Sequence, residues 1–382
     1  MKLSERVINN LKERRDRLLN GDINSIPSPF KRFRDDLVGI EQAKFYMVTS
    51  KTKGGKTQFA SNFFIYNSIL YAYYNPEQVR VKIFYYPLEE TPENIMERFM
   101  CYLLYTLSGN KYRINPKDLR STNNDKPLPL EILELLESEQ YKEIIQFFED
   151  SIIFSTSTNA TGVYKECKAY AEANGKVHTK KCKITDELGQ VKEVDGFDYY
   201  EPNDPKEYKL IFYDHISLIS LERNMDLRQS MSKLSEYFVL LRNRYGFTPI
   251  VIQQQAFHEN IDAFKMDKLK PSLVTLADNK AIARDVDICL GIFSPYSYEL
   301  REYMGYSIEK FKDNIRFLEV IINRSGQSNG MIALYFDGAV NYWKELPLPN
   351  DSNALQTIYN WMDKTKKNML FFINSFKRML NK

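Results

Sequence analysis

A run of eight residues, Ser50-Lys51-Thr52-Lys53-Gly54-Gly55-Lys56-Thr57, has the residue types and spacing of a phosphate-binding loop. In loops of the form G-x-x-x-x-G-K-[ST], backbone N–H groups surround the phosphates, the lysine reaches the β and γ oxygens, and the hydroxyl binds Mg²⁺. Gly55, Lys56 and Thr57 match the second half of this pattern, whereas Ser50 replaces its first glycine. An apolar run precedes the loop and helical spacing follows it over 58–74. We therefore predict that residues 50–57 bind the phosphates of ATP.

Two further acidic positions follow apolar runs that are typical of strands. Asp214 comes directly after 210–213, where a carboxylate at a strand end can hold Mg²⁺ together with Thr57. Glu89 follows the run 81–86 and is the candidate for polarising an attacking water. Either acid could instead be a solvated loop residue, but the upstream lysine loop favours the catalytic interpretation.

Expected strands and expected helices alternate along the chain, which predicts an α/β fold whose mostly parallel sheet is covered by helices on both faces. The expected strands are 45–48, 81–86, 152–154, 210–213, 249–252, 286–292 and 317–322. Helices are expected at 58–74, 92–107, 162–173 and 231–245.

The organisation outside this alternation suggests three parts. Residues 1–25 form an N-terminal linker helix, with an apolar stripe over 3–19 that must pack either on its own domain or on a neighbouring subunit. Residues 26–350 form the ATPase domain, with insertions at about 108–150 and 175–207, and the second insertion suggests a projecting hairpin that turns near 187–190. Residues 351–382 form a helical tail, whose apolar stripe is expected to pack on the domain rather than on a replication partner or a membrane surface.

Composition excludes several classes of protein. The 382 residues are 43% hydrophobic with a net charge of +3, so the chain can bury a core and has no overall basic character that would indicate nucleic-acid binding. Four cysteines without a C-x-x-C pair do not suggest a disulfide framework. The charged start does not resemble a secretory leader, and no apolar run is long enough to span a membrane. We expect a cytoplasmic protein without membrane contact.

Taken in order, these stretches resemble the ATPase domain of DnaB-type replicative helicases, a branch of the RecA-like superfamily. The matching stretches are 50–57, 87–91, 212–215, 253–255, 281–287 and 323–326. The resemblance covers roughly residues 26–340 and implies a RecA-like P-loop ATPase fold with ATP and Mg²⁺ as cofactors.

Residue by residue, the resemblance assigns roles to six positions. Lys56 and Thr57 fall on the phosphate and Mg²⁺ contacts, and Asp214 falls on the metal-side acid. Glu89 falls on the residue that activates water. Gln255 falls on the glutamine that senses nucleotide, and Arg324 on the arginine finger that reaches the ATP of the adjacent subunit. Lys265, Lys268 and Lys270 lie where the family has a DNA-binding loop. A solvated charged loop remains the alternative for these three lysines.

The departures from the family bear on function. Ser50 replaces a glycine, Ile322 replaces a lysine that precedes the finger by two residues, and Ala277 replaces an arginine. We expect the family's N-terminal primase-binding domain to be missing, since only the 3–19 helix precedes the stretches that match the ATPase domain. In the family such a linker helix docks on the next protomer, which favours exchange of the 3–19 helix between subunits. The expected lack of the N-terminal domain and the high content of Lys, Asn and Tyr would suit a phage-encoded or virus-encoded copy acting in the host cytoplasm.

The sequence therefore predicts a ring-forming ATP-dependent DNA helicase of DNA replication, a homo-hexamer on single-stranded DNA with a primase or polymerase as possible partner. One alternative is a RecA-family DNA-binding ATPase that acts in recombination or loading without unwinding. A second is a nucleotide-bound scaffold protein in which hydrolysis is weak.

Overall fold

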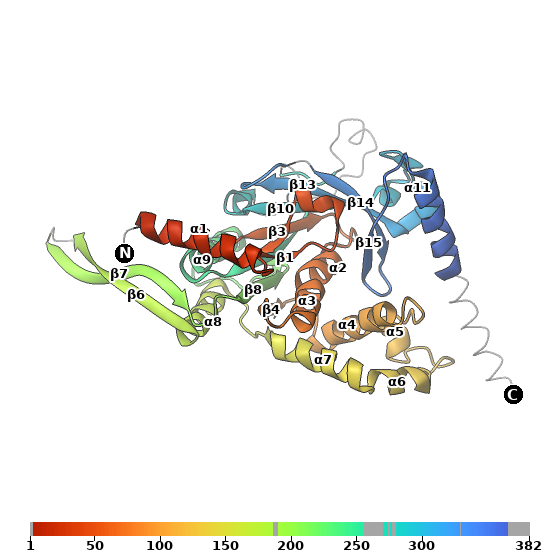
Figure 1. Cartoon of the computed structure of the whole chain (residues 1–382), viewed down its shortest axis with the longest axis horizontal. Coiled ribbons are helices and arrows are strands. Elements are labelled where there is room, and N and C mark those ends of the chain that lie inside the picture. The colour runs from red at the N-terminus through yellow and green to blue at the C-terminus, as the bar shows by residue number, and fades with distance from the viewer. Residues whose placement is uncertain are drawn as a thin grey trace.

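A computed structural model describes residues 3–185, 190–255, 270–273, 276, 280–328 and 330–365 of the chain. Its centre is a nine-stranded sheet of order β15-β14-β13-β10-β3-β9-β8-β4-β5, with helices on both faces (Figure 1). The fold is mixed α/β, as the alternation of elements predicted.

The parallel part of the sheet places the carboxyl ends of five strands together. It consists of β3 (Tyr46–Ser50), β4 (Arg80–Pro87), β5 (Ile152–Phe154), β8 (Glu207–Asp214), β9 (Thr248–Gln254) and β10 (Ile288–Phe293). Ser50 lies across from Gln254 and Ile292, and Pro87 lies across from Asp214. Because the carboxyl ends of parallel strands meet at one edge, the loop after β3 and the acids after β4 and β8 share that edge.

The rest of the sheet is antiparallel. It consists of β13 (Ile315–Asn323), β14 (Met331–Asp337) and β15 (Tyr342–Glu345), which extend the sheet beyond β10. The strand expected at 317–322 is therefore present but runs against its neighbour, and β14 and β15 are strands that the sequence analysis did not predict. Five of the eight strand pairs in the described sheet are parallel, so it is mostly parallel.

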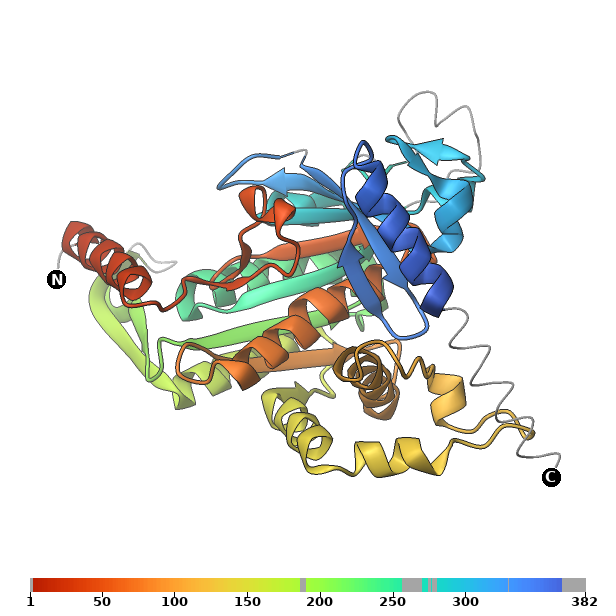
Figure 2. The ribbon, with the colours of Figure 1, turned by 45° about the vertical axis from the view of Figure 1, so that its right-hand side comes forward.

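Two helical layers cover the sheet, and strand side chains alternate between them. One layer comprises α2 (Lys56–Ala60), α3 (Asn67–Tyr74), α4 (Pro92–Leu107) and α7 (Glu139–Ser151), and the other α8 (Ala160–Ala173) and α9 (Leu227–Tyr245) (Figure 2). On β8, Leu210 and Phe212 face the first layer, whereas Ile211 and Tyr213 face the second. A π-helical turn, Ser61–Tyr66, joins α2 to α3 as one continuous helix. Burial on both faces explains why the strands are continuous apolar runs.

The first insertion is helical and belongs to the core. It contains α5 (Pro116–Leu119), α6 (Leu130–Leu136) and α7, although its polar runs gave no helical prediction. Phe148 is buried and stacks on Phe99 of α4 with ring centroids 4.0 Å apart. Arg113 donates two hydrogen bonds to the buried Asp337 at the end of β14, at 2.5 and 2.7 Å. The insertion therefore connects the helical layer to the far end of the sheet.

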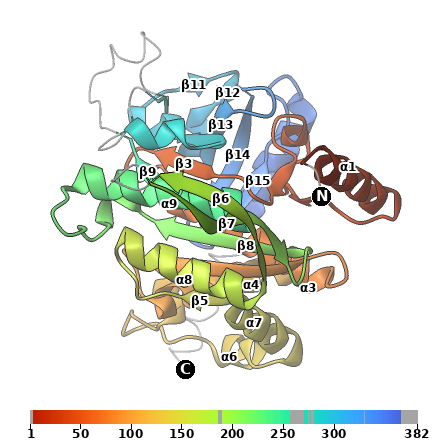
Figure 3. The same cartoon turned by 90° about the vertical axis from the view of Figure 1, so that its left-hand side faces the viewer.

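Two elements project from one end of the molecule. The N-terminal helix α1 (Leu3–Leu19) has the predicted bounds but buries none of its residues. Beside it lies the predicted hairpin, formed by β6 (Gly175–Thr185) and β7 (Val191–Pro202) (Figure 3). At the other end of the chain, residues 352–365 form a helix that packs on the domain through Leu355, Ile358 and Met362. The apolar stripe of the predicted tail beyond residue 365 lies outside the described residues.

Within the described part of the chain, no helix is both long and apolar enough to cross a membrane.

Candidate functional site

The predicted phosphate-binding loop connects β3 to the first turn of α2. Gly55 precedes that turn with a φ of +96°, a left-handed conformation that favours glycine. Ser50 closes the start of the loop, because its hydroxyl donates a 2.8 Å hydrogen bond to the Lys51 carbonyl. A Cβ on Gly54 would lie 2.7 Å from the same hydroxyl oxygen. The serine therefore fits where the sequence pattern has glycine, and glycine is needed at position 54 instead.

Two side chains from the antiparallel strands support this loop. Arg316 on β13 is almost fully buried and donates from Nε to the Gly54 carbonyl at 3.0 Å. Its other bonds reach the Asp313 carboxylate and two carbonyls, which fixes the guanidinium. Trp343 on β15 lies 3.4 Å from the position that a Cβ on Gly55 would take. Arg316 was not among the residues predicted from the sequence, although a lone arginine in an apolar strand was a detectable signal.

Lys51 turns away from the open side of the loop. Its ammonium lies 4.3 Å from the ring centroid of Tyr298, a cation–π contact that burial strengthens. The same burial lowers the pKa of Lys51. Of the three lysines in the loop, Lys56 is the one at the start of α2, where the motif places the phosphate contact.

Asp214 at the end of β8 meets Thr57 at the start of α2. The Thr57 hydroxyl donates to Asp214 Oδ1 at 3.3 Å, and the carboxylate is 3% exposed. Burial raises the pKa of Asp214 to about 7, and the nearby charge of Glu89 adds to the shift. Two partners, Thr57 and Lys56, act in the opposite direction. A nearby positive charge favours the ionised form of a carboxyl, so a cation bound beside Asp214 would offset the cost of burying its charge.

Glu89 lies at the adjacent strand end. The Leu88 N–H donates to the Asp214 carbonyl at 3.2 Å, which joins the two loops. Glu89 Oε1 lies 3.0 Å from Nε2 of His215, so the residue after the buried aspartate orients the candidate base. The next acid, Glu90, pairs with Arg98 at 2.8 Å, and burial raises its pKa. Sequence reasoning missed His215, because only the fold places it against Glu89.

Two glutamines at the end of β9 contact the loop in different ways. Gln255 is buried beneath it and donates to the Thr49 hydroxyl at 2.9 Å, while its N–H donates to the Ser50 carbonyl at 2.9 Å. Gln254 is more exposed and donates to the Thr52 hydroxyl within the loop. The structure thus places both side chains against the β3–α2 segment, with Gln254 on the loop itself.

Arg324 lies at the opposite edge of the sheet. It follows β13, whose last residue, Asn323, pairs with Ile288, and Ile288 in turn pairs with Tyr46 at the start of β3. Four residues of strand separate Tyr46 from Ser50, which is about 13 Å. The exposed guanidinium donates to the Arg284 carbonyl on its own edge. The fold therefore does not bring Arg324 to the phosphate-binding loop of its own chain.

Of the three predicted DNA-contacting lysines, Lys265 and Lys268 lie outside the described residues. Lys270 is described, and its ammonium lies 3.7 Å from the Glu319 carboxylate on β13.

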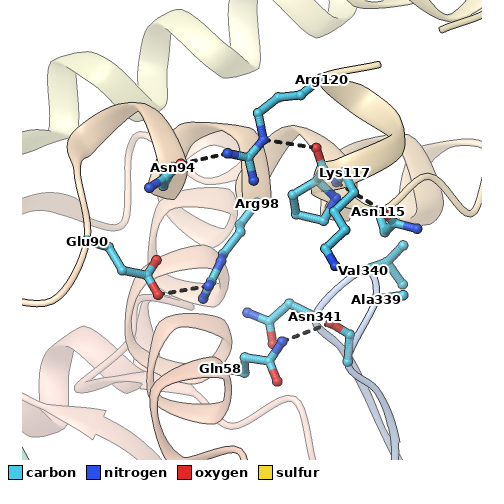
Figure 4. A pocket seen from close by; sticks show the side chains of 12 residues that line it. Gln58, Glu90, Asn94, Arg98, Asn115, Lys117, Arg120, Ala339, Val340 and Asn341 are labelled. Atoms are coloured by element: carbon cyan, nitrogen blue, oxygen red, sulfur yellow. Dashed lines mark hydrogen bonds and ion pairs between the residues drawn. The ribbon is translucent and has the colours of Figure 1, made fainter. Parts of the chain in front are cut away.

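A cavity of about 490 Å³ opens beside the first turn of α2. It is bounded by Gln58, by α4 and α5, and by the turn between β14 and β15. Figure 4 shows Arg98 and Lys117 extending into it from two different helices. The Gln58 amide donates to the Gly338 carbonyl at 2.8 Å, which connects α2 to that turn. The cavity starts one residue beyond Thr57, so it adjoins the phosphate site.

The residues at this edge fit a small, hard cation. Thr57 and Asp214 offer a hydroxyl and a carboxylate oxygen, the ligand type that Mg²⁺ prefers when phosphates supply further ligands. The raised pKa of Asp214 indicates a buried carboxylate that lacks full charge compensation. Among the described residues no group of three His, Cys, Asp or Glu side chains forms a metal site, so any ion here would also need ligands from a nucleotide.

The fold, rather than the sequence, relates this chain to known proteins. No protein-family model matches the sequence, and no curated protein matches it either. Among solved structures, one described as an ATPase domain aligns with a TM-score of 0.59 and 13% identity, over 91% of this chain and 99% of that one.

A structure described as a DnaB-like replicative helicase and its interactions with primase aligns with a TM-score of 0.57 and 14% identity. The alignment covers 90% of this chain and 66% of that chain. The chain has the fold of a DnaB-like helicase ATPase domain. This DnaB-like fold is RecA-like, as the order of the sequence motifs implied, and at such low identity the comparison shows the fold alone.

The buried carboxylate of the DnaB-like fold predicts a pH-dependent stability. The pKa of Asp214 is about 7 when folded, whereas an unfolded aspartate titrates at about 3.9. The stability that the protonated form contributes is therefore fully present below about pH 4 and is lost as the pH rises through 7. In Asp214→Asn this loss disappears. We compare the free energy of unfolding of the variant minus that of the native protein. This difference should be roughly 2–3 kcal/mol larger at pH 8 than at pH 5.

Urea unfolding of the ligand-free proteins at the two pH values measures this difference. Asp351→Asn, a change at an exposed aspartate, is the control and should show no such growth. A constant difference between Asp214→Asn and the native protein would contradict the assignment of a buried, protonated carboxyl.

The contact between Arg316 and the loop predicts an effect on nucleotide binding. Arg316→Met keeps the length of the side chain but removes the donor to the Gly54 carbonyl. Hydrogen bonds from charged groups contribute roughly 1.5–3 kcal/mol, so ATP affinity should fall about tenfold or more. Titration with a fluorescent ATP analogue measures it. Arg301→Met, at an 88% exposed side chain, is the matched control, and equal affinities of the two variants would refute a supporting role.

Proposed function

We propose that this chain is an ATP-dependent DNA helicase that assembles into a ring, with six subunits as the expected number, and moves along single-stranded DNA during replication. The observation that carries the proposal is the split site. The phosphate-binding loop, Thr57 and Asp214 lie together at one edge of the sheet, whereas Arg324 lies at the other. A head-to-tail contact between copies would complete the site, and such contacts form a ring when the rotation from one copy to the next closes.

Hydrolysis would follow from the groups at the loop edge. Lys56 and the N–H groups at the start of α2 would hold the triphosphate, and the cavity beside Gln58 would receive the nucleoside. Thr57 and Asp214 would hold Mg²⁺, which when bound offsets charge on the phosphates. Glu89, oriented by His215 at 3.0 Å, would accept the proton of the attacking water. Gln254 and Gln255 would couple the conformation of the loop to that of the residues that follow β9.

DNA would be held without base selection. Lys265, Lys268 and Lys270 follow the strand that ends at the loop, and lysines contact phosphates rather than base edges. Binding should therefore depend strongly on salt. One of the similar structures is described together with a primase, and a primase or polymerase is accordingly the partner that we propose for this chain.

Removal of the phosphate-contacting lysine tests the motor. In a forked-duplex assay, Lys56→Ala should abolish both ATP turnover and strand separation, because no other described lysine occupies the start of α2. The exposed Lys31→Ala variant should keep both. If the native protein turns over ATP without separating strands, the alternative of a RecA-family ATPase in recombination or loading is favoured. If it binds ATP without turnover, even with single-stranded DNA, a scaffold role is favoured.

Mixing two inactive variants tests whether Arg324 acts between copies. Arg324→Ala should lower ATP turnover by about 1,000-fold or more, the usual effect of losing an arginine finger. In a mixture with Lys56→Ala, roughly a quarter of the interfaces would pair an intact loop with an intact finger, so activity should return. ATPase rates of the separate and mixed proteins measure this. A mixture as inactive as its components would show that Arg324 does not act in trans.

A further inference from the structure

The β6–β7 hairpin is firmly anchored at its base. The Tyr200 hydroxyl donates to the carbonyls of Ala171 and Asn174 at 2.9 and 3.1 Å, and the buried ammonium of Lys209 lies 4.5 Å from its ring centroid. On the same strand, Phe197 packs against Tyr245 and lies under Arg244. These contacts hold the base of the hairpin against α8 and α9, so the rest of it projects in a fixed direction.

The projecting part of the hairpin is exposed and has ion pairs between its two strands. Lys181 pairs with Asp195 at 2.9 Å and Lys180 with Asp198 at 3.4 Å. Strand β6 carries four lysines and no acid, and Lys176 and Lys183 are exposed. Beyond its base, the described contact of the ribbon with another element is that of Arg6 of α1, and a two-stranded ribbon with so little support is only marginally stable by itself. This suggests that the ribbon has a binding partner.

Helix α1 lies along this hairpin. Arg6 is 3.9 Å from the Asp198 carboxylate and 4.9 Å from the ring centroid of Tyr199. The helix presents apolar side chains to solvent, among them Leu3 at 69% and Leu11 at 62% exposure, together with cations such as Lys12 and Arg15. We call α1 and the β6–β7 hairpin together the arm. Across α1, β6 and β7, its surface combines exposed leucines with ten lysines and arginines and seven acids, four of which lie on β7, so the positive excess is carried by α1 and β6.

The opposite end of the molecule has the complementary surface. Helix α6 and the start of α7 carry exposed carboxylates at Glu134, Glu137, Glu139 and Glu143. Beside them Leu130 and Leu133 are 67% and 44% exposed. We call these six residues the acidic patch. Figures 1 and 2 show the arm at one end of the molecule and α6 at the other.

We propose that the β6–β7 hairpin is a second assembly element beside α1, and that the arm binds the acidic patch of a second copy of this chain. The partner is a copy because both surfaces lie on one chain at opposite ends, which fits a heterologous, head-to-tail contact. The arm projects from the edge of the sheet that carries Arg324, since β8 begins at Glu207 shortly after β7 ends. The copy that receives the arm is therefore on the side of Arg324. The proposal rests on the ring that we propose above.

Charge reversal tests the proposal without disturbing the core. Lys176→Glu with Lys183→Glu changes the hairpin, and Glu137→Lys with Glu139→Lys changes the acidic patch. Each double variant should weaken self-association about tenfold, since like charges would face each other across the interface. All four changes in one chain should restore it to within about threefold of the native value. Glu149→Lys with Asp150→Lys, exposed acids at the far end of α7, is the matched control and should leave association unchanged.

Sedimentation with a non-hydrolysable ATP analogue, at low and moderate salt, measures association, and analogue binding by each variant confirms that the fold and the nucleotide site are intact. Restoration in the fourfold variant would support the arm. Two results would overturn the proposed contact between the arm and the acidic patch but leave the proposed ring intact. In both the native protein assembles, and either the charge reversal on the hairpin has no effect or the fourfold variant associates no better than the double variants. If the native protein binds the analogue yet stays monomeric with DNA, both the ring and the arm are overturned.

Discussion

The carboxylate of Asp214, buried against the hydroxyl of Thr57, is the interaction on which the arrangement of the site depends. It is possible because β3 and β8 are parallel and end at the same edge, with only β9 between them. Burial raises the pKa of this carboxyl to about 7, because the charged form is poorly solvated in the interior. A cation bound beside Asp214 would favour the charged form of the carboxyl and lower its pKa, so protonation of Asp214 and binding of a cation oppose each other.

The core of this site could be predicted from the sequence because its signals are local. Each signal is contained in about ten residues: the loop 50–57, the apolar run before Asp214 and the strand before Glu89. Parallel strands then bring these segments together. The order of the same motifs also indicated the RecA-like fold. The sequence predicted the hairpin and the bounds of α1 for similar reasons, since a charged turn and a helical stripe are patterns within one segment.

What the sequence did not indicate depends on contacts between distant segments. Arg316 and Trp343 reach the loop only because β13 to β15 add to the sheet in the antiparallel sense, and neither β14 nor β15 was expected. The first insertion is polar in sequence, yet Phe148 stacks on Phe99 in the core. His215 contacts Glu89 across two strand ends, a contact that no pattern in a single segment contains.

Strand β13 carries an arginine near each of its ends. Arg316 holds the Gly54 carbonyl of its own loop, and Arg324 follows the last residue of the strand at the far edge of the sheet. Eight residues of extended chain separate them, which is roughly 27 Å. The strand pairs with β14 over 315–319 and with β10 over 317–323, so it is held from end to end by neighbouring strands and its length is fixed. In the proposed assembly, the phosphate-binding loop of one copy and the Arg324 guanidinium that would face the next copy are therefore fixed to the two ends of one rigid strand.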